Sequence, residues 1–292
     1  MGVVAPSGVV DGERLRSGVG ILRDWGLDVR VGAHVEARQG FLAGSDAERL
    51  EDLHAMFADP LIRAVLCARG GYGIQRLAPA LQLAGLRVAA KLVIGFSDAT
   101  ALLARLVNER LPAIHGPMVA KDLSGLGVAA REHFFRLLSD PGYRWELPVP
   151  VSIRSGTAEG PLVGGCLSVL ASLLGTPWAP RTAGAILFLE DVSEPPYRLD
   201  RLLTQLRQAG LLDHLAGVVF GTMAGCPTVA EVTAGDVVRA FFADAPFPVG
   251  FGLAAGHGPA ARDVENYALP LAVQVRLDTA AGRLVGLEAP IS

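Results

Sequence analysis

Residues 92–106 read LVIGFSDATALLARL, and this stretch decides the fold. The apolar run 92–94 predicts a buried strand, and the residues after position 98 have the pattern of a helix. Ser97 then lies at a sharp turn between the two, with its hydroxyl exposed in front of the helix N-terminus. Serine and aspartate also cap helices, so the tetrapeptide Gly95-Phe96-Ser97-Asp98 alone leaves a nucleophilic and a capping role open.

Strand and helix patterns alternate throughout the first half of the chain. Strands are expected at 3–6, 27–31, 64–68 and 92–95, and helices at 12–25 and 45–58. The second helix begins with Ser45-Asp46-Ala47-Glu48, which predicts a capping box. The run 64–68 is apolar throughout, as in strands buried on both faces. This alternation predicts a parallel sheet covered by helices.

A segment rich in proline and glycine, residues 141–160, predicts a linker between two domains. The N-terminal domain then spans residues 1–140, and the C-terminal domain spans residues 161–292. Within the latter the pattern predicts helices at 167–174, 196–209 and 229–242, strands at 185–189, 217–220, 249–251 and 272–277, and a hairpin turn at 280–282.

The composition excludes several classes of protein. The chain has 292 residues, of which 51% are hydrophobic and 19% are charged, as in ordered proteins with large cores. The net charge is −3 and the basic residues are scattered, so no nucleic-acid partner is expected. The N-terminal residues do not have the pattern of a signal peptide, and glycines and a proline interrupt the longest uncharged run, so no membrane partner is expected.

The cysteines and histidines give no sign of a metal site. Cys67, Cys166 and Cys226 are odd in number and far apart, which predicts buried thiols in a reducing compartment. No two of the six histidines lie three to five residues apart, so no compact histidine-based metal site is indicated. We therefore expect neither a metal nor another cofactor.

Three further segments could complete a site around Ser97, because a serine nucleophile needs a base, an orienting acid and oxyanion donors. The glycine-rich turn Ala68–Gly73 follows the strand that ends at Cys67. Its backbone N–H groups could approach a ligand closely, although the pattern by itself favours a plain tight turn. Glu190 ends an apolar strand, where it could orient an imidazole or simply be solvated. His257 lies between two glycines, as a catalytic base or as an incidental loop histidine.

Together with other motifs, these segments resemble one family, the serine LD-carboxypeptidases that cut the peptide stem of peptidoglycan. The resemblance covers nearly the whole chain, and Glu-Asp-x-x-Glu-x-x-Tyr-Arg-x-Asp-Arg is its most specific part. The family belongs to a wider group that includes the self-immunity amidases acting on microcin C-type antibiotics. The motifs are Val4–Ser7, Arg69–Gly73 with Arg76-Leu77, Gly95–Leu102, His115–Met118, Gly164–Ser168 with Gly175–Pro177, Leu189–Asp191 with Pro196–Arg201, and Gly256-His257 with Asn266 and Leu269-Pro270.

The resemblance implies a catalytic triad. Ser97 would be the nucleophile, His257 the general base and Glu190 the orienting acid, in the same chain order as in α/β-hydrolases. The backbone N–H of Asp98 would be one oxyanion donor, because it follows the nucleophile directly. The second donor implied by the family is the backbone N–H of Gly71.

Substrate contacts are less well defined than the triad. The forked donors of Arg69 suit a substrate carboxylate, although a structural role is an equal alternative. Tyr72, in the same glycine-rich turn, is the other candidate for substrate binding. Cys166 stands where the family usually has asparagine, and the segment 258–265 after His257 is somewhat long for the family.

We therefore expect a two-domain α/β fold. The N-terminal part resembles a flavodoxin-like three-layer domain that carries Ser97. The C-terminal part would be a smaller mixed α/β, barrel-like domain that supplies Glu190 and His257. The active site would lie between the two, where pockets are common. By resemblance the protein is also expected to form a homodimer.

The expected activity is that of a cytoplasmic, metal-independent serine LD-carboxypeptidase. It would release the terminal D-Ala from the tetrapeptide stem of muropeptides during peptidoglycan recycling. The alternative is an immunity-type serine amidase that hydrolyses aminoacyl-nucleotide antibiotics with the same triad. A non-catalytic α/β protein that binds small molecules through the glycine-rich turn is the alternative from another class.

Overall fold

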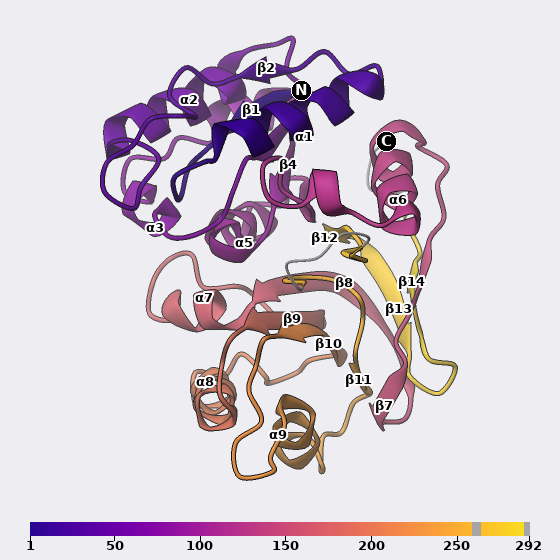
Figure 1. The fold of residues 1–292 in the computed structure, drawn as a ribbon. Coiled ribbons are helices and arrows are strands. Elements are labelled where there is room, and N and C mark those ends of the chain that lie inside the picture. The colour runs from indigo at the N-terminus through magenta and orange to yellow at the C-terminus, as the bar shows by residue number, and fades with distance from the viewer. Residues whose placement is uncertain (259–263, 289–292) are drawn as a thin grey trace.

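A computed structural model describes residues 1–258 and 264–288, which form two sheets and their covering helices (Figure 1). The first sheet has the strand order β12-β5-β4-β3-β1-β2, and β1 to β5 are parallel. Its order 2-1-3-4-5 is that of flavodoxin-like folds, which confirms the α/β prediction for this part. The strands are β1 Gly2–Val4, β2 Arg30–Val31, β3 Ala64–Cys67, β4 Leu92–Gly95, β5 Ala113–His115 and β12 Leu269–Leu271.

Of the helices that connect these strands, the apolar periodicity predicted α1, α2 and α5. α5 follows β4 after the short helical turn η1 and lies between the two sheets (Figure 1). The predicted capping box opens α2, since the backbone N–H of Glu48 donates to Ser45 Oγ over 3.2 Å and Glu48 Oε2 accepts from the backbone N–H of Ser45. The helical elements here are α1 Gly12–Asp24, α2 Asp46–Ala58, α3 Ile74–Leu77, α4 Ala84–Ala89, η1 Ser97–Ala99, α5 Thr100–Asn108, η2 Leu123–Gly125 and α6 Val128–Ser139.

The second sheet has the order β6-β14-β13-β8-β9-β10-β11-β7, with β8 to β11 parallel. Its two edge strands are separated by only two residues in the chain, so the sheet must curl until its edges meet. This is the barrel-like form expected for the C-terminal part. Its elements are β6 Glu146–Pro148, β7 Val151–Arg154, β8 Thr157–Cys166, α7 Leu167–Ser172, β9 Ile186–Val192, α8 Pro196–Gln208, β10 Gly217–Ala224, α9 Ala234–Phe241, β11 Val249–Phe251, β13 Gln274–Asp278 and β14 Arg283–Gly286.

In the segment 141–160, which the sequence predicts as a linker, residues 146–148, 151–154 and 157–160 belong to β6, β7 and β8 of the second sheet. The prolines that suggested a linker are compatible with this because Pro148 ends an edge strand, where a missing N–H breaks no sheet ladder. In addition, β12 lies late in the chain but pairs antiparallel with β5 in the first sheet. The division at residues 140 and 161 stays a prediction.

The helix predicted from residue 229 begins later, at Ala234. Val229 and Val232 pair with each other across a tight turn, in which Ala230 and Glu231 have positive φ. Thr233 then caps the helix in a capping box with Asp236. Val229 and Val232 have the spacing of neighbours on one face of a helix, but in the structure they flank the turn.

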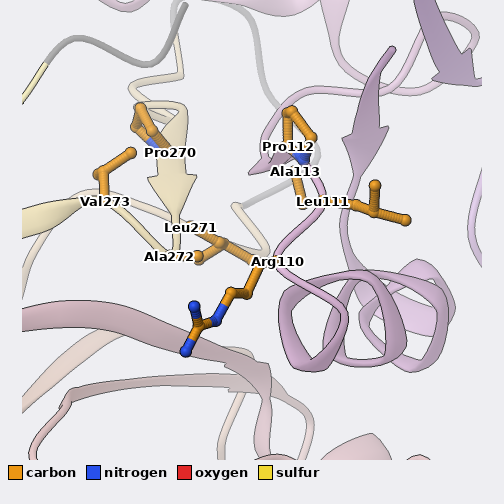
Figure 2. Close-up of a pocket in the computed structure, with 8 residues that line it drawn as sticks. All are labelled: Arg110, Leu111, Pro112, Ala113, Pro270, Leu271, Ala272 and Val273. Carbon is orange, nitrogen blue, oxygen red and sulfur yellow. The ribbon is translucent and has the colours of Figure 1, made fainter. Parts of the chain in front are cut away.

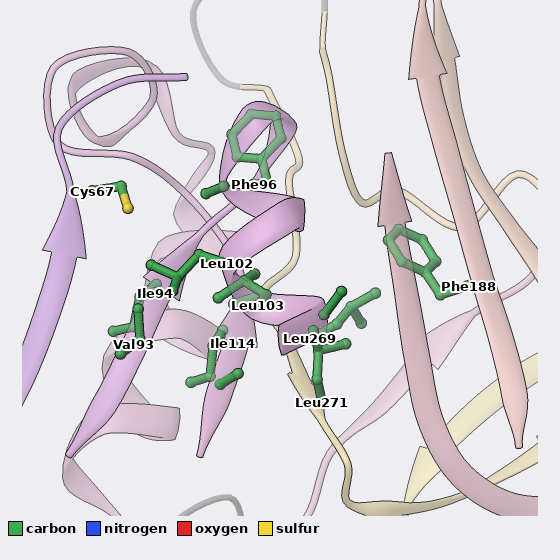
Figure 3. Packing of buried hydrophobic residues seen from close by; sticks show 14 of the residues in the cluster. Cys67, Val93, Ile94, Phe96, Leu102, Leu103, Ile114, Phe188, Leu269 and Leu271 are labelled. Carbon is green, nitrogen blue, oxygen red and sulfur yellow. The ribbon is translucent and has the colours of Figure 1, made fainter. Parts of the chain in front are cut away.

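The two sheets share one core. Buried apolar residues from both form a continuous cluster, and Figure 3 shows members from β4, β5 and α5 facing Leu269 of β12 and Phe188 of β9. Such packing fixes how the two sheets lie relative to each other. Within residues 1–258 and 264–288, none of the helices has the length and apolar character needed to cross a membrane.

We expect Ser45→Ala to lower the free energy of unfolding by about 1 kcal/mol, because it removes one half of the capping box of α2. Urea denaturation measures the change. Ser139→Ala is the control, because the Ser139 hydroxyl only donates to the Phe135 carbonyl near the end of an exposed helix turn. Equal effects of the two substitutions would contradict the capping role.

Candidate active site

Ser97 lies immediately beyond the carboxyl end of β4, in the single turn η1 that leads into α5. Its φ is +62°, a left-handed conformation that is uncommon for residues with a side chain. A strained turn of this kind between strand and helix raises a serine hydroxyl above the sheet. Ser97 is half-buried, so its hydroxyl is held in place and still accessible.

Glu190 lies on β9 of the second sheet, His257 lies in the segment that follows β11, and both meet Ser97 in one hydrogen-bonded chain. Ser97 Oγ lies 3.0 Å from His257 Nε2, and His257 Nδ1 lies 2.7 Å from Glu190 Oε2. The same Glu190 oxygen accepts a bond from the backbone N–H of His257 over 2.9 Å. An ionised carboxylate only accepts, so Nδ1 carries the proton and Nε2 accepts from the Ser97 hydroxyl. This is the arrangement in which a histidine can deprotonate a serine.

Glu190 is completely buried on β9, and its charge depends on His257. Burial alone would raise the pKa of Glu190, but the hydrogen bond from the His257 side chain and its charge hold this pKa below its usual range. Glu190 is therefore ionised at neutral pH and can stabilise an imidazolium. Gly256 makes the contact possible, because a Cβ at that position would lie 2.4 Å from Glu190 Oε2.

The neighbouring carboxylates have other partners. Asp191 accepts from the backbone N–H of Ser168 over 2.7 Å and from its hydroxyl over 3.2 Å. Glu194 pairs with Arg198 over 2.8 Å. Among the residues that the structure describes, Glu190 is thus the carboxylate that bonds the imidazole of His257.

The glycine-rich turn lies directly against Ser97. A Cβ on Gly70 would be 2.8 Å from Ser97 Cβ and 2.9 Å from Ser97 Oγ, so only glycine fits there. The next residue, Gly71, packs against Gly8, and the backbone N–H of Gly8 donates to the Gly70 carbonyl over 3.1 Å. Gly71 and Asp98, the two expected oxyanion donors, thus lie on segments that meet at Ser97.

The side chain of Asp98 joins these segments. Its Oδ2 accepts from the Ser7 hydroxyl over 2.7 Å and from the backbone N–H of Ile74 over 3.0 Å. Burial raises the pKa of Asp98 against the effect of these two hydrogen bonds. From the sequence only the backbone of Asp98 has an expected role. The bond from Ser7 to its side chain could not be predicted, because the two residues are 91 positions apart and no spacing rule connects them.

The two residues expected to bind substrate lie on the exposed side of the same turn. The guanidinium of Arg69 donates to the Val9 carbonyl, which agrees with the structural alternative for this residue. Tyr72 is about half exposed and packs against the more exposed Phe41, with 6.0 Å between ring centroids. Phe41 belongs to no sequence motif, and only the structure shows that it lies beside Tyr72.

Cys166, which replaces the family's asparagine, stays close to the site without touching Ser97. Its backbone N–H donates to Thr100 Oγ1 over 3.1 Å, so it ties β8 to the first turn of α5. Its thiol lies 3.6 Å from Asp191 Oδ1, and burial raises its pKa well above the usual value. Cys67 is also a buried free thiol, whereas Cys226 is only half-buried, which corrects the expectation of three buried thiols. The other family departure, the long segment after His257, falls largely on residues 259–263, outside the described residues.

One pocket lies at the seam between β5 and β12 and is separate from this site. Figure 2 shows its lining, Arg110–Ala113 and Pro270–Val273. Ala113 pairs with Val93 at the start of β4, whereas Ser97 follows the end of that strand. The pocket is therefore at the opposite end of the sheet from Ser97.

In the part of the chain that the structure describes, no group of three or more potential metal ligands comes together. The site is instead a serine, a histidine and a carboxylate in hydrogen-bonded order at the carboxyl ends of parallel strands. An α/β fold with such a site defines the protein as a serine hydrolase in class.

Comparisons with known proteins define the family. The LD-carboxypeptidase N-terminal domain matches residues 1–116, and the LD-carboxypeptidase C-terminal domain matches residues 159–277. The murein tetrapeptide carboxypeptidase of Pseudomonas aeruginosa is 40% identical over 239 residues, which cover 77% of this chain and 76% of that protein. The chain belongs to the LD-carboxypeptidase family.

Solved structures agree with this assignment. The muramoyltetrapeptide carboxypeptidase from Oxalobacter formigenes has a TM-score of 0.87 at 29% identity, over 97% of this chain and 96% of that one. The microcin C7 self-immunity protein MccF, solved with aspartyl sulfamoyl adenosine, has a TM-score of 0.87 at 22% identity. The match covers 100% of this chain and 96% of MccF. At 22% identity the likeness concerns the fold alone.

We expect Gly70→Ala to lower turnover about 100-fold or more, because the added methyl group would displace Ser97 from its productive position. The rate of hydrolysis and the thermal midpoint are measured together. Gly20→Ala, in α1, is the control, since a Cβ there meets nothing within 4 Å. Normal turnover in Gly70→Ala would show that the turn can move away from Ser97 freely.

Proposed function

We propose that this protein is a serine LD-carboxypeptidase that releases the terminal D-Ala from the tetrapeptide stem of muropeptides. The observation that carries the proposal is the hydrogen-bonded chain from Ser97 through His257 to Glu190. Membership of the LD-carboxypeptidase family and the named substrate of the Pseudomonas aeruginosa relative support the choice of substrate.

In this proposal Ser97 attacks the carbonyl of the L,D amide bond while His257 Nε2 takes the hydroxyl proton. The tetrahedral intermediate collapses, the C–N bond breaks, and His257 gives the proton to the leaving amine of D-Ala. Water, deprotonated by His257, then hydrolyses the acyl-enzyme and releases the shortened peptide. Glu190 keeps Nδ1 protonated throughout and stabilises the imidazolium in both half-reactions.

The oxyanion would be held by the backbone N–H groups of Asp98 and Gly71. Asp98 lies at the N-terminal end of the helical segment after Ser97, where N–H groups have no intrahelical partners. The contact of Gly70 with Ser97 brings the glycine-rich turn to the same point. Arg69 and Tyr72, on the exposed side of that turn, are the proposed contacts for the peptide stem.

Mass analysis of the products tests the proposed reaction. A free tetrapeptide that ends in D-Ala and its disaccharide-linked form are offered, with an aminoacyl sulfamoyl adenosine as a competing substrate. Release of D-Ala alone supports the proposal. Preferential hydrolysis of the adenosine compound would support the immunity-type amidase, and hydrolysis of neither would favour a binding protein.

We expect Ser97→Ala and His257→Ala each to lower turnover by about three orders of magnitude or more, and the double variant to be little worse. The reason is that the two residues act as one unit, so either loss removes the same step. The two single variants and the double variant are compared by their turnover of the tetrapeptide. Losses that add would indicate that the two residues act separately.

We expect Glu190→Gln to lower turnover about 100-fold or more, since the amide has no charge and permits the wrong imidazole tautomer. Binding of substrate should change much less, because the carboxylate acts mainly on the transition state. Asp191→Asn and Glu194→Gln are the matched controls, because their carboxylates bond Ser168 and Arg198 instead. A large loss in either control with near-normal Glu190→Gln would reassign the orienting acid.

Two further properties are proposed on the family resemblance alone. We propose that the protein acts in the cytoplasm, where muropeptides would be recycled, and that it forms a homodimer. Light scattering of the purified protein at micromolar concentration decides the oligomeric state. A molar mass close to 30.5 kDa would refute the dimer.

A further inference from the structure

His115 ends β5, beside the end of β4 that leads to Ser97, and the proposed mechanism gives it no role. It pairs with Gly95 of β4 on one side and with Leu269 of β12 on the other. The side chain has no solvent exposure. The sequence analysis found it only as part of the motif His115–Met118.

Two phenylalanines enclose the ring. The His115 ring centroid lies 5.5 Å from that of Phe96 and 4.9 Å from that of Phe188. Phe96 precedes Ser97 and packs edge-on against His257 at 4.9 Å, and Phe188 is two residues before Glu190 on the same face of β9. Figure 3 shows these two phenylalanines on facing elements. His115 therefore occupies the floor of the site, between the elements that carry the three proposed catalytic residues.

Buried polar atoms of both His115 and Glu190 have no hydrogen-bond partners. Within the described residues, neither ring nitrogen of His115 has a hydrogen-bond partner, and Oε1 of Glu190 has none either. Oε2 of Glu190 takes both bonds from His257. A buried carboxylate oxygen without a donor is costly, and so is a buried imidazole N–H without an acceptor. A neutral imidazole has one donor, which is what Oε1 requires.

We propose that His115 is a positioning residue that holds Oε1 of Glu190 through its ring N–H across a single bridging water. Glu190 would then be held from both sides, by His257 on Oε2 and by His115 on Oε1. The inference rests on the proposed serine mechanism and concerns the same site. It adds a fourth side chain that keeps the orienting acid ionised and in place.

The charge state of His115 agrees with a donor that stays neutral. Burial lowers the pKa of His115 to about 4, although the Glu190 charge acts in the opposite direction. His115 is then uncharged over the range in which a serine hydrolase works, and it supports Glu190 without competing with His257 for its charge. The other titratable groups that act on Glu190 in the described structure are His257, Cys166, Asp191 and Asp122.

Loss of the His115 donor should shift the acidic limb of the pH–activity profile in a known direction. A hydrogen bond to the charged form lowers a carboxyl pKa, so His115→Phe should raise the pKa of Glu190. On acidification the carboxylate would then become protonated at a higher pH than in the wild type. The acidic limb of the activity profile should therefore move to higher pH. Burial raises the pKa of Asp122 to about 6, within the same range, so the shift is also measured in an Asp122→Asn background.

The experiment compares His115→Phe with His115→Asn and His115→Gln, which retain an N–H donor. We expect His115→Phe to lower kcat about 10-fold or more with KM nearly unchanged, and to move the acidic limb up by about one pH unit. At least one of the two amide variants should recover most of both losses. His133→Phe is the matched control: His133 is also buried, but it contacts Tyr143 and the Ala268 carbonyl, so its loss should lower the thermal midpoint without moving the pH profile.

A second readout separates this inference from the proposed function. The rate at which a fluorophosphonate labels Ser97 is measured against pH, and it requires no natural substrate. Failure of the wild-type protein to react at Ser97 would refute the serine mechanism itself. If the wild type reacts and His115→Phe has the same rate and pH profile, or if the amide variants are as impaired as His115→Phe, His115 is only a packing residue.

Discussion

The hydrogen bond between Ser97 Oγ and His257 Nε2 joins two different sheets, and the rest of the structure must hold it at 3.0 Å. Ser97 lies in η1 between β4 and α5, whereas Glu190 lies on β9 of the second sheet and His257 in the segment that follows β11. The docking of the sheets is therefore part of the site. β12 adds a late segment of the chain to the first sheet, and the Cys166 N–H bonds Thr100 at the start of α5. A shift of about 1 Å between the sheets would be enough to impair proton transfer.

The second constraint is the cost of a buried carboxylate. Glu190 has no solvent exposure, and an ionised group in such a place is tolerated only with hydrogen-bonded partners. His257 supplies two bonds to one oxygen, so His257 and Glu190 stabilise each other. Asp191, the adjacent residue, does not take part in this pair. Its carboxylate is committed to Ser168 at the start of α7.

Local patterns in the sequence predicted those parts of the fold and site that depend on neighbouring residues. The strand, turn and helix around Ser97, the capping box at Ser45 and the parallel sheet covered by helices follow from apolar periodicity and turn chemistry, whereas the flavodoxin-like form was implied by the family resemblance. The placement of β12, the strands within 141–160 and the partners of Asp98 depend on contacts between distant segments, which no spacing rule contains. His115 shows the same limit: the motif marks the residue, but only the fold shows that its ring lies between Phe96 and Phe188.

The strained turn at Ser97 connects stability with activity. A residue with a side chain at positive φ costs about 1 to 3 kcal/mol, and such strain persists only where the surroundings determine the conformation. Here the surroundings are the Asp98 carboxylate, bonded to Ser7 and to the N–H of Ile74, and the close contact of Gly70 with Ser97. These contacts bring three segments of the first sheet to one point. The interactions that offset the strain are thus the same ones that place the glycine-rich turn beside Ser97, so the fold cannot relax this turn without moving the proposed oxyanion donors.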